Sequence, residues 1–264
     1  MTDGQELARR YLAQQRQLGG DAVILNRATG RGGDAQRPGD APRPPSPGRP
    51  PDPPAAVLDL PPPGIVYEPP ARDLFTDDPL RHATSLEAIA RLVRACRACR
   101  LCDHRTHAVP GEGPAAARLV VVGEGPGRTE DETGRPFVGQ AGDLLTKILA
   151  AIGLPREQVF ICNVVKCRPP ENRTPLYDEV QACLPYLFRQ IELIRPAVIL
   201  AMGGTAAQAL LDTKQSLGAL RNKVHRFRGI PLVVTYHPAA LLRNPNWKRP
   251  TWDDVRIARR LLDG

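Results

Sequence analysis

Residues 117–124 read ARLVVVGE, a continuous apolar run that ends in a glycine and an acidic residue. Such a run is typical of a strand that is buried on both faces of a parallel sheet. Similar runs follow as VFICNVV at 159–165, AVILAMG at 197–203 and IPLVVTYH at 230–237. The sequence therefore predicts four buried strands after residue 116.

Segments with helical periodicity lie before, between and after these strands. The predicted helices are 85–96, with Ser85 as its cap, 141–154, 176–194, 204–211 and 251–262. Alternating strands and helices favour an α/β domain with a mostly parallel sheet. In such a sheet, ligands bind in the crevice at the carboxyl ends of the strands.

The N-terminal part of the chain has a different composition. Residues 38–70 hold fourteen prolines in 33 positions, which predicts a disordered, partly polyproline linker. Before it, residues 4–20 have helical spacing and are predicted to form a short helix. We therefore divide the chain into an N-terminal extension, 1–82, and a folded domain, 83–264.

Charge and apolar content narrow the classes of protein to which this chain can belong. The net charge is +8, but residues 1–80 carry nine Arg against eleven acidic residues, and the remainder carries 27 basic and 17 acidic residues. This charge is typical of a domain that binds a polyanion such as DNA or RNA. It fits equally well a basic protein that binds no nucleic acid. Because no long apolar run or signal peptide is present, we expect a cytoplasmic protein that does not contact membranes.

Three predicted strands end in polar residues that suit a shared site. Glu124, Asn163 and His237 lie at the ends of the first, second and fourth strands. Taken singly, a glycine-rich turn, a capping Asn and a His before Pro are each common structural features. GEGPG at 123–127 also lacks the spacing of a dinucleotide-binding loop and the Lys of a P-loop. The joint placement of Glu124, Asn163 and His237 at strand ends favours a functional pocket.

Cysteines cluster in RACRACRLC, residues 94–102, where Cys96, Cys99 and Cys102 are each separated by two residues. In a reducing compartment a disulfide framework is not expected, so metal ligands or redox groups are the first interpretation. The alternative is a set of scattered thiols without a shared role.

Three segments together resemble the signature motifs of family 4 uracil-DNA glycosylases, the iron–sulfur type. They are VVVGEGPGRTEDETGRPFVGQAG, CNVVKCRPPENRTP and YHPAALLRN, and they occur in the order of that family. The resemblance covers roughly residues 90–262. It implies a three-layer α/β/α fold around a central four-stranded, mostly parallel sheet. It also implies a DNA repair enzyme that hydrolyses the N-glycosidic bond of uracil in DNA and leaves an abasic site.

The resemblance also implies roles for individual residues. Glu124 would position water and stabilise positive charge on the sugar, and His237 would donate a hydrogen bond to uracil O2. Asn163 would bind the polar edge of uracil. The other implied contacts are Phe137 stacked on the base, backbone groups of Gly123 and Gly125 along the pocket, Leu241 or Leu242 in the gap left in the duplex, and Arg243 near the phosphates.

How thymine is rejected is not clear from the motifs. Glu130 or Asp131, in the segment RTEDE, is our candidate for crowding the C5 position of the base.

For the cysteines, the resemblance implies a [4Fe–4S] cluster on Cys96, Cys99, Cys167 and Cys183. Four thiolates would suit zinc equally well by ligand count, and Cys102 in place of Cys96 would keep the two-residue spacing. We predict that Cys102 is not a ligand, that Cys162 is a core residue and that the cluster is structural.

A different class of function is also open, a non-catalytic DNA-binding module like the polymerase-associated domains of similar sequence. Such a module would need neither Glu124, Asn163 nor His237. We expect a monomer that acts on single- or double-stranded DNA containing uracil, and the extension is a candidate site for a protein partner.

Overall fold

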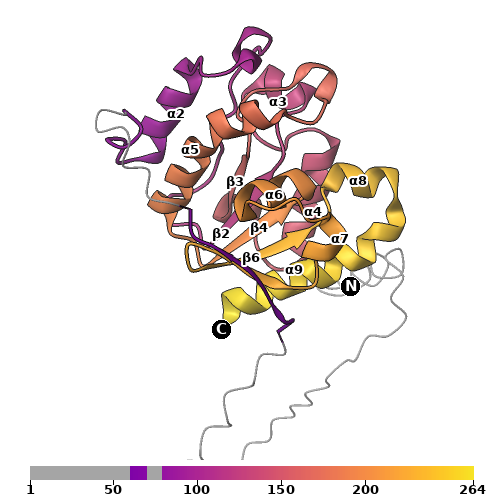
Figure 1. The fold of residues 1–264 in the computed structure, drawn as a ribbon. Helices are drawn as coiled ribbons and strands as arrows, with labels where there is room; N and C mark the ends of the chain where they lie inside the picture. The colour runs from indigo at the N-terminus through magenta and orange to yellow at the C-terminus, as the bar shows by residue number, and fades with distance from the viewer. Residues whose placement is uncertain (1–59, 70–78) are drawn as a thin grey trace, which may run out of the picture. The chain divides into compact units, whose positions relative to one another are not determined.

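A computed structural model describes residues 60–69 and 79–264 of the chain. The predicted N-terminal helix and most of the proline-rich segment lie outside these residues. Six strands form one sheet, in the order β1-β5-β6-β4-β2-β3 (Figure 1). The strands are β1 Pro63–Tyr67, β2 Leu119–Gly123, β3 Phe160–Asn163, β4 Val198–Met202, β5 Val224–Phe227 and β6 Ile230–Thr235. All neighbours pair in parallel except β5 and β6.

The five predicted helices are present near their predicted bounds, and further short helices lie between them. The α-helices are α2 Leu86–Ala95, α3 Arg128–Thr133, α4 Gln140–Ala151, α5 Tyr177–Ile194, α6 Gly204–Leu211, α7 Leu217–Leu220, α8 Pro238–Arg243 and α9 Lys248–Asp263. The 3-10 turns are η1 Arg100–Asp103, η2 Arg156–Gln158, η3 Pro170–Asn172 and η4 Pro245–Trp247.

Alternate side chains of the central strands point to opposite faces and build two separate cores. On one face, Val120, Val122 and Ile199 pack with apolar residues of α5 and α6. On the other face, Val121 and Leu200 pack with residues of α4 and α9. This arrangement confirms the three-layer α/β/α fold, because the central strands β2, β3 and β4 are buried on both faces, as their apolar runs indicate.

The sheet has six strands rather than the four predicted, and both added strands lie at one edge. β1 comes from the segment that we predicted to be linker, yet it pairs in parallel with β5. The Ile65 amide donates a hydrogen bond to Nδ1 of His225, 2.9 Å away, which ties the two strands together. Proline is tolerated at the first position of an edge strand, so Pro63 did not prevent the pairing. β5 was missed because its residues, VHRF, alternate between buried and exposed and lack an apolar run.

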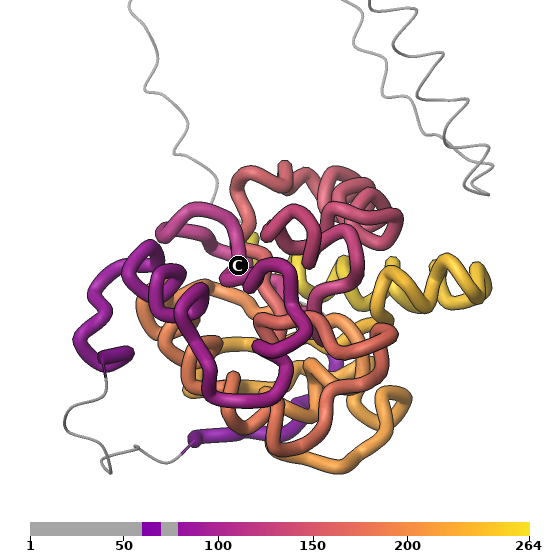
Figure 2. Tube along the Cα trace, turned by 90° about the horizontal axis from the view of Figure 1, so that it is seen from above, coloured from indigo at the N-terminus to yellow at the C-terminus, as the bar shows by residue number. Residues whose placement is uncertain are grey.

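A smaller third core holds α2 beside the main domain. Ser85 caps this helix as predicted, because its side chain accepts a hydrogen bond from the Ala88 amide at 3.1 Å. Ile89 and Val93 of α2 are buried against residues that include Leu80. Figure 2 shows the purple α2 segment on the opposite side of the domain from the yellow C-terminal helices. Among the helices of residues 60–69 and 79–264, none is long and apolar enough to cross a membrane.

Candidate active site

The carboxyl ends of four parallel strands bring the predicted pocket residues together. Because β6, β4, β2 and β3 are neighbours in that order, their ends lie side by side at one edge of the sheet. Glu124 directly follows β2 and Asn163 ends β3, while His237 follows β6 after one intervening residue. All three residues therefore lie at the carboxyl ends of the strands, where the sequence pattern predicts them.

Gly123 shows how closely the pocket walls approach each other. A Cβ atom at this position would lie 2.4 Å from Oδ1 of Asn163 and 2.5 Å from Cζ of Phe137. Only glycine permits the amide and the ring to pack against the backbone from both sides. A Cβ at Gly125 would lie 2.7 Å from Cγ2 of Val165, so the turn after β2 is equally close to the segment after β3.

Phe137 occupies the pocket through an unusual backbone conformation. Its φ is 51°, in the left-handed region, and its side chain is buried. The ring centroid lies 5.4 Å from that of His237, with 32° between the two planes. A left-handed phenylalanine is a strained arrangement of the kind that is found at functional sites.

Asn163 has a polar side chain that the fold buries without satisfying. Its exposed fraction is 1%, and neither Oδ1 nor Nδ2 has a hydrogen-bond partner among the described residues. Buried amides are normally hydrogen-bonded, so an unpaired one at a strand end marks a place for a ligand. The ligand that would satisfy it must present one acceptor and one donor side by side.

His237 is held in one protonation state and one tautomer. It caps α8, and its Nδ1 accepts a hydrogen bond from the Ala239 amide at 3.2 Å. Burial, with a smaller contribution from the charge of Arg243, lowers the pKa of His237 to about 4. The ring is therefore neutral near neutral pH, and because Nδ1 is an acceptor, Nε2 carries the proton.

Glu124 has a partner that the sequence analysis did not single out. Its Oε2 accepts a hydrogen bond from the hydroxyl of Thr205, in the first turn of α6 after β4. The polar sequence GGT at 203–205, directly after a buried strand, was the available signal. The sequence pattern predicts only the end of a strand at 203 and a helix from 204.

Glu130 and Asp131 do not reach the pocket as free carboxylates. Oε1 of Glu130 accepts hydrogen bonds from the Val138 and Gly139 amides, both at 2.9 Å. Oδ1 of Asp131 accepts one from the Thr106 amide at 2.9 Å. Both side chains therefore hold loops in place, and their proposed contact with the C5 position of the base stays a prediction.

The two leucines of α8 differ in exposure. Leu241 is 1% exposed and belongs to the core, whereas Leu242 is 48% exposed. Arg243, the next residue, is also exposed. Of the two leucines that we predicted to insert into DNA, the buried Leu241 is therefore unavailable in this structure, and Leu242 is available.

A family model described as the Uracil DNA glycosylase superfamily matches residues 110–257, which is more than half of the chain and includes all of the strand ends described above. The chain belongs to the uracil-DNA glycosylase superfamily. Its relatives include proteins named Type-4 uracil-DNA glycosylase from Pyrobaculum aerophilum, 48% identical over 61% of this chain and 86% of the relative, and from Thermotoga maritima, 48% identical over 60% and 85%. A third, from Sulfurisphaera tokodaii, is 46% identical over 67% of this chain and 84% of the relative. Within the superfamily, the chain is a member of the type-4 glycosylases.

This type-4 glycosylase has a second feature, a hollow lined by cysteines. It has a volume of about 300 Å³, including its open mouth. The lining residues are Val93, Cys96, Ala98, Cys99, Cys102, Lys166, Cys167, Ala182, Cys183 and Tyr186. Cys162 lies within β3 and is buried, as predicted for a core residue. Across the described ranges, no three His, Cys, Asp or Glu side chains converge to hold a metal ion.

Hydrogen bonds to the sulfur atoms distinguish the cysteines of this hollow. The Lys166 amide donates to Sγ of Cys183 at 3.2 Å, and the Arg105 guanidinium donates to Sγ of Cys167 at 2.9 Å. Sγ of Cys96 accepts from the Ala98 amide at 3.5 Å. Donors aimed at sulfur stabilise thiolates, the form that binds metals.

Cys102 and Cys183 lie in contrasting environments. The Cys102 thiol donates to Oδ1 of Asp103 at 3.4 Å, and a carboxylate beside a thiol disfavours ionisation. Burial raises the pKa of Cys183 to about 12. Without a cation in the hollow the Cys183 thiol therefore stays protonated, and a bound cation would reverse this preference.

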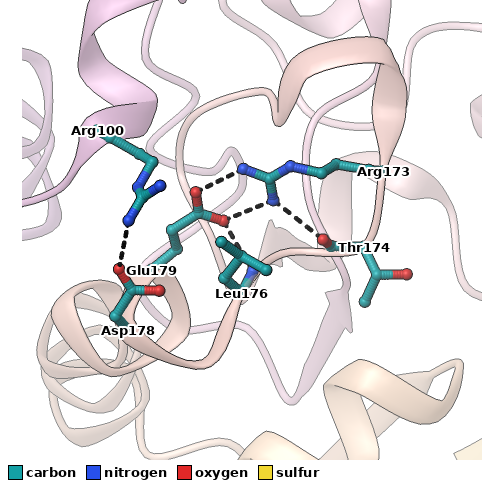
Figure 3. A network of polar contacts seen from close by, with 6 residues as sticks. All are labelled: Arg100, Arg173, Thr174, Leu176, Asp178 and Glu179. Atoms are coloured by element: carbon teal, nitrogen blue, oxygen red, sulfur yellow. Dashed lines mark hydrogen bonds and ion pairs between the residues drawn. The ribbon is translucent and has the colours of Figure 1, made fainter.

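A polar network ties the cysteine-bearing segments of the glycosylase together (Figure 3). The Arg173 guanidinium donates to both carboxylate oxygens of Glu179, at 2.8 and 2.7 Å. Arg100, beside Cys99, pairs with Asp178 at 3.5 Å. These contacts join the Cys99 segment and the loop after Cys167 to the start of α5, the helix that carries Cys183.

Lys166 connects the hollow to the pocket. Its side chain is buried, and Nζ donates to the backbone oxygen of Asn163 at 2.8 Å and to Oε1 of Gln190 at 2.7 Å. Lys166 also lines the cysteine hollow. Its side chain therefore joins that hollow to the end of β3, where Asn163 lies.

Proposed function

We propose that this protein hydrolyses the N-glycosidic bond between uracil and deoxyribose in DNA, which starts base excision repair. The relatives named Type-4 uracil-DNA glycosylase support this proposal through their 46–48% identity. The single observation that carries it is the buried, unpaired amide of Asn163, packed at Gly123 beside the Phe137 ring.

Uracil fits the unpaired amide of Asn163. Uracil presents an acceptor at O4 next to a donor at N3, which the Nδ2 and Oδ1 atoms of one amide can satisfy together. Cytosine presents the opposite pattern, so in the amide orientation that pairs with uracil it would leave both groups unpaired, which costs a buried site about 1–3 kcal/mol for each group. The Phe137 ring would stack on the face of the bound base.

Bond cleavage requires charge stabilisation at two places. As the C1′–N1 bond breaks, its electron pair moves to uracil, and the sugar becomes an oxocarbenium-like cation that water then attacks. Neutral His237 would donate from Nε2 to O2 of the developing uracil anion. The Glu124 carboxylate would stabilise the cation, orient the water and accept its proton as the oxygen adds to C1′; the uracil anion then takes up one proton from solvent, which completes the hydrolysis.

Base flipping would depend on α8. A base inside a duplex is out of reach of the pocket, so the nucleotide must leave the stack at a cost of a few kcal/mol. We propose that the exposed Leu242 fills the gap and that Arg243 contacts a phosphate. The basic character of residues 81–264 supports binding to DNA.

We also propose that the hollow holds a [4Fe–4S] cluster on Cys96, Cys99, Cys167 and Cys183. Four cysteine thiols that line one hollow, two of which receive N–H donors at sulfur, are the ligand type that iron–sulfur clusters take. The carboxylate beside Cys102 favours Cys96 as the fourth ligand. The cluster would supply cross-links between chain segments, since glycosidic hydrolysis transfers no electrons.

We make four further proposals about this protein. They are a glycosylase domain at 83–264 after an extension at 1–82, a protein partner for that extension, a monomeric state and a cytoplasmic location, where the thiols would stay reduced. β1 belongs to the proposed extension by sequence, but it pairs with β5 of the glycosylase sheet.

A matched set of oligonucleotides tests the proposed activity. Purified protein is incubated with DNA carrying a single U, T or C, and abasic sites are cleaved with alkali and resolved on a gel. We expect cleavage at U only, and a loss of at least about 100-fold in His237→Ala with DNA binding retained. Binding without cleavage at U by the unaltered protein would favour the non-catalytic DNA-binding module instead.

A further inference from the structure

The end of β4 forms a wall of the pocket between two proposed catalytic side chains. The Gly203 amide donates to the backbone oxygen of Thr235 at 2.8 Å, which fixes the turn after β4 against β6. A Cβ at Gly203 would lie 3.3 Å from Cβ of His237, and its φ of 96° is one that favours glycine. Thr205, two residues later, reaches Glu124 on the other side.

The hydrogen bond between Thr205 and Glu124 has a fixed direction. An ionised carboxylate has no proton to give, so the hydroxyl must donate and Oε2 must accept. Bonds to ionised acceptors are short and about twice as strong as neutral ones. Thr205 also lies in the first turn of α6, where the helix dipole favours a negative charge. Among the side chains of the described residues, Thr205 is the one that donates to the Glu124 carboxylate.

We infer that Thr205 is a positioning residue that holds the Glu124 carboxylate in the orientation needed to assist water attack. This inference rests on the proposed uracil excision and adds to it a residue outside the three resembling motifs. A branched side chain in a helical turn has few rotamers, so the hydroxyl is already aimed before the substrate arrives.

Removing the hydroxyl while keeping the shape tests this role. Thr205→Val is expected to lower the single-turnover rate of uracil release about 10- to 100-fold, with unchanged affinity for uracil-containing DNA and unchanged iron content. Thr205→Ser restores the hydroxyl and is expected to stay within about 3-fold of the unaltered protein. Thr146→Val is the matched control, because this half-buried hydroxyl donates only to the Gly142 backbone oxygen, at 3.1 Å on α4.

A double-mutant cycle separates positioning from a general structural effect. In a Glu124→Ala background, which removes the acceptor, Thr205→Val should lower the rate by much less than it does alone, because the two residues act through one contact. An equal loss in both backgrounds would overturn the inference, as would a fully active Thr205→Val. If Thr205→Val does not fold, the same cycle with Thr205→Ala decides. Absence of uracil release by the unaltered protein would instead contradict the proposed function itself.

Discussion

Asn163 illustrates at the scale of one residue how binding and stability conflict in this protein. Its amide is buried and unpaired among the described residues, at the end of a strand whose other side chains are apolar core. A fold selected for stability alone would place an apolar side chain there, because an unsatisfied amide is destabilising. The conflict is resolved only when a ligand supplies the missing donor and acceptor.

Replacing Asn163 by Leu should therefore separate the two properties. We expect Asn163→Leu to raise the free energy of unfolding by about 1 kcal/mol, since the unpaired amide is removed with little change of volume. Uracil release should fall below detection. Urea denaturation and the gel assay measure the two effects, and a variant that is both less stable and fully active would contradict this account of the pocket.

The pKa of His237 predicts how stability depends on pH. The pKa falls from an ordinary value of 6.5 to about 4 on folding, so the unfolded chain binds a proton more readily. The stability that comes from the neutral ring is complete above pH 6.5 and is lost as the pH falls toward 4, by about 3 kcal/mol in total. His237→Gln should flatten this part of the stability curve, measured by urea denaturation at several pH values. An unchanged slope would contradict the assignment.

Sequence patterns could predict Glu124, Asn163 and His237 because each follows an apolar run, and parallel strands bring such ends to one edge. They placed Thr205 after a strand in the same way, but they could not predict its bond to Glu124, because Thr in the first turn of a helix is a common structural residue. For Glu130 and Asp131, the proposed contact with C5 of the base stays a prediction, and the backbone amides that these carboxylates hold could not be predicted either. Whether a carboxylate faces a ligand or a backbone amide depends on loop geometry.

At the scale of elements, the central strands and long helices were predictable, and the sheet edge was not. β2, β3, β4 and β6 are apolar up to their last residue, and this composition has few other interpretations. β1 lies among prolines and exposes Val66, so its own pattern does not indicate a strand; in the structure, backbone bonds at Pro62 and Tyr67 and the bond from Ile65 to His225 hold it.

Replacing Gly64 tests whether β1 is attached to the sheet as the structure shows. A Cβ there would lie 2.4 Å from Nδ1 of His225, the atom that accepts the Ile65 amide. Gly64→Ala should therefore lower the free energy of unfolding by about 2 kcal/mol, as over-packing does. Gly218→Ala, on α7 with open space around the new methyl group, should leave stability unchanged or slightly increased. Equal denaturation midpoints for the two variants would show that β1 is not held as described.

At the scale of the whole molecule, the cysteine hollow joins segments that are far apart in the chain. Cys96 and Cys99 follow α2, Cys167 follows β3, and Cys183 lies within α5. Lys166 then links this hollow to the strand end that carries Asn163. If the proposed cluster is present, we expect its loss to weaken both stability and uracil binding, because the proposed role of the cluster is to cross-link the chain and not to cleave the bond.

Iron content tests the proposed ligands. Protein purified without oxygen should be brown, and Cys183→Ser should lose the visible absorbance and bound iron together with several degrees of thermal stability, roughly what a loss of 1–2 kcal/mol produces. Cys102→Ser is the control and should keep its iron. A Cys102→Ser protein that loses its iron, or a Cys96→Ser protein that keeps it, would overturn the ligand assignment.

The central claim, that this chain excises uracil, is tested most directly by the products. Duplex DNA with one U is incubated with the protein, free uracil is quantified by chromatography, and abasic sites are counted with an aldehyde reagent. The account predicts equal amounts of uracil and abasic sites from the unaltered protein, and neither product from Asn163→Leu. Protein with its iron bound that associates with this DNA and releases no uracil would contradict it.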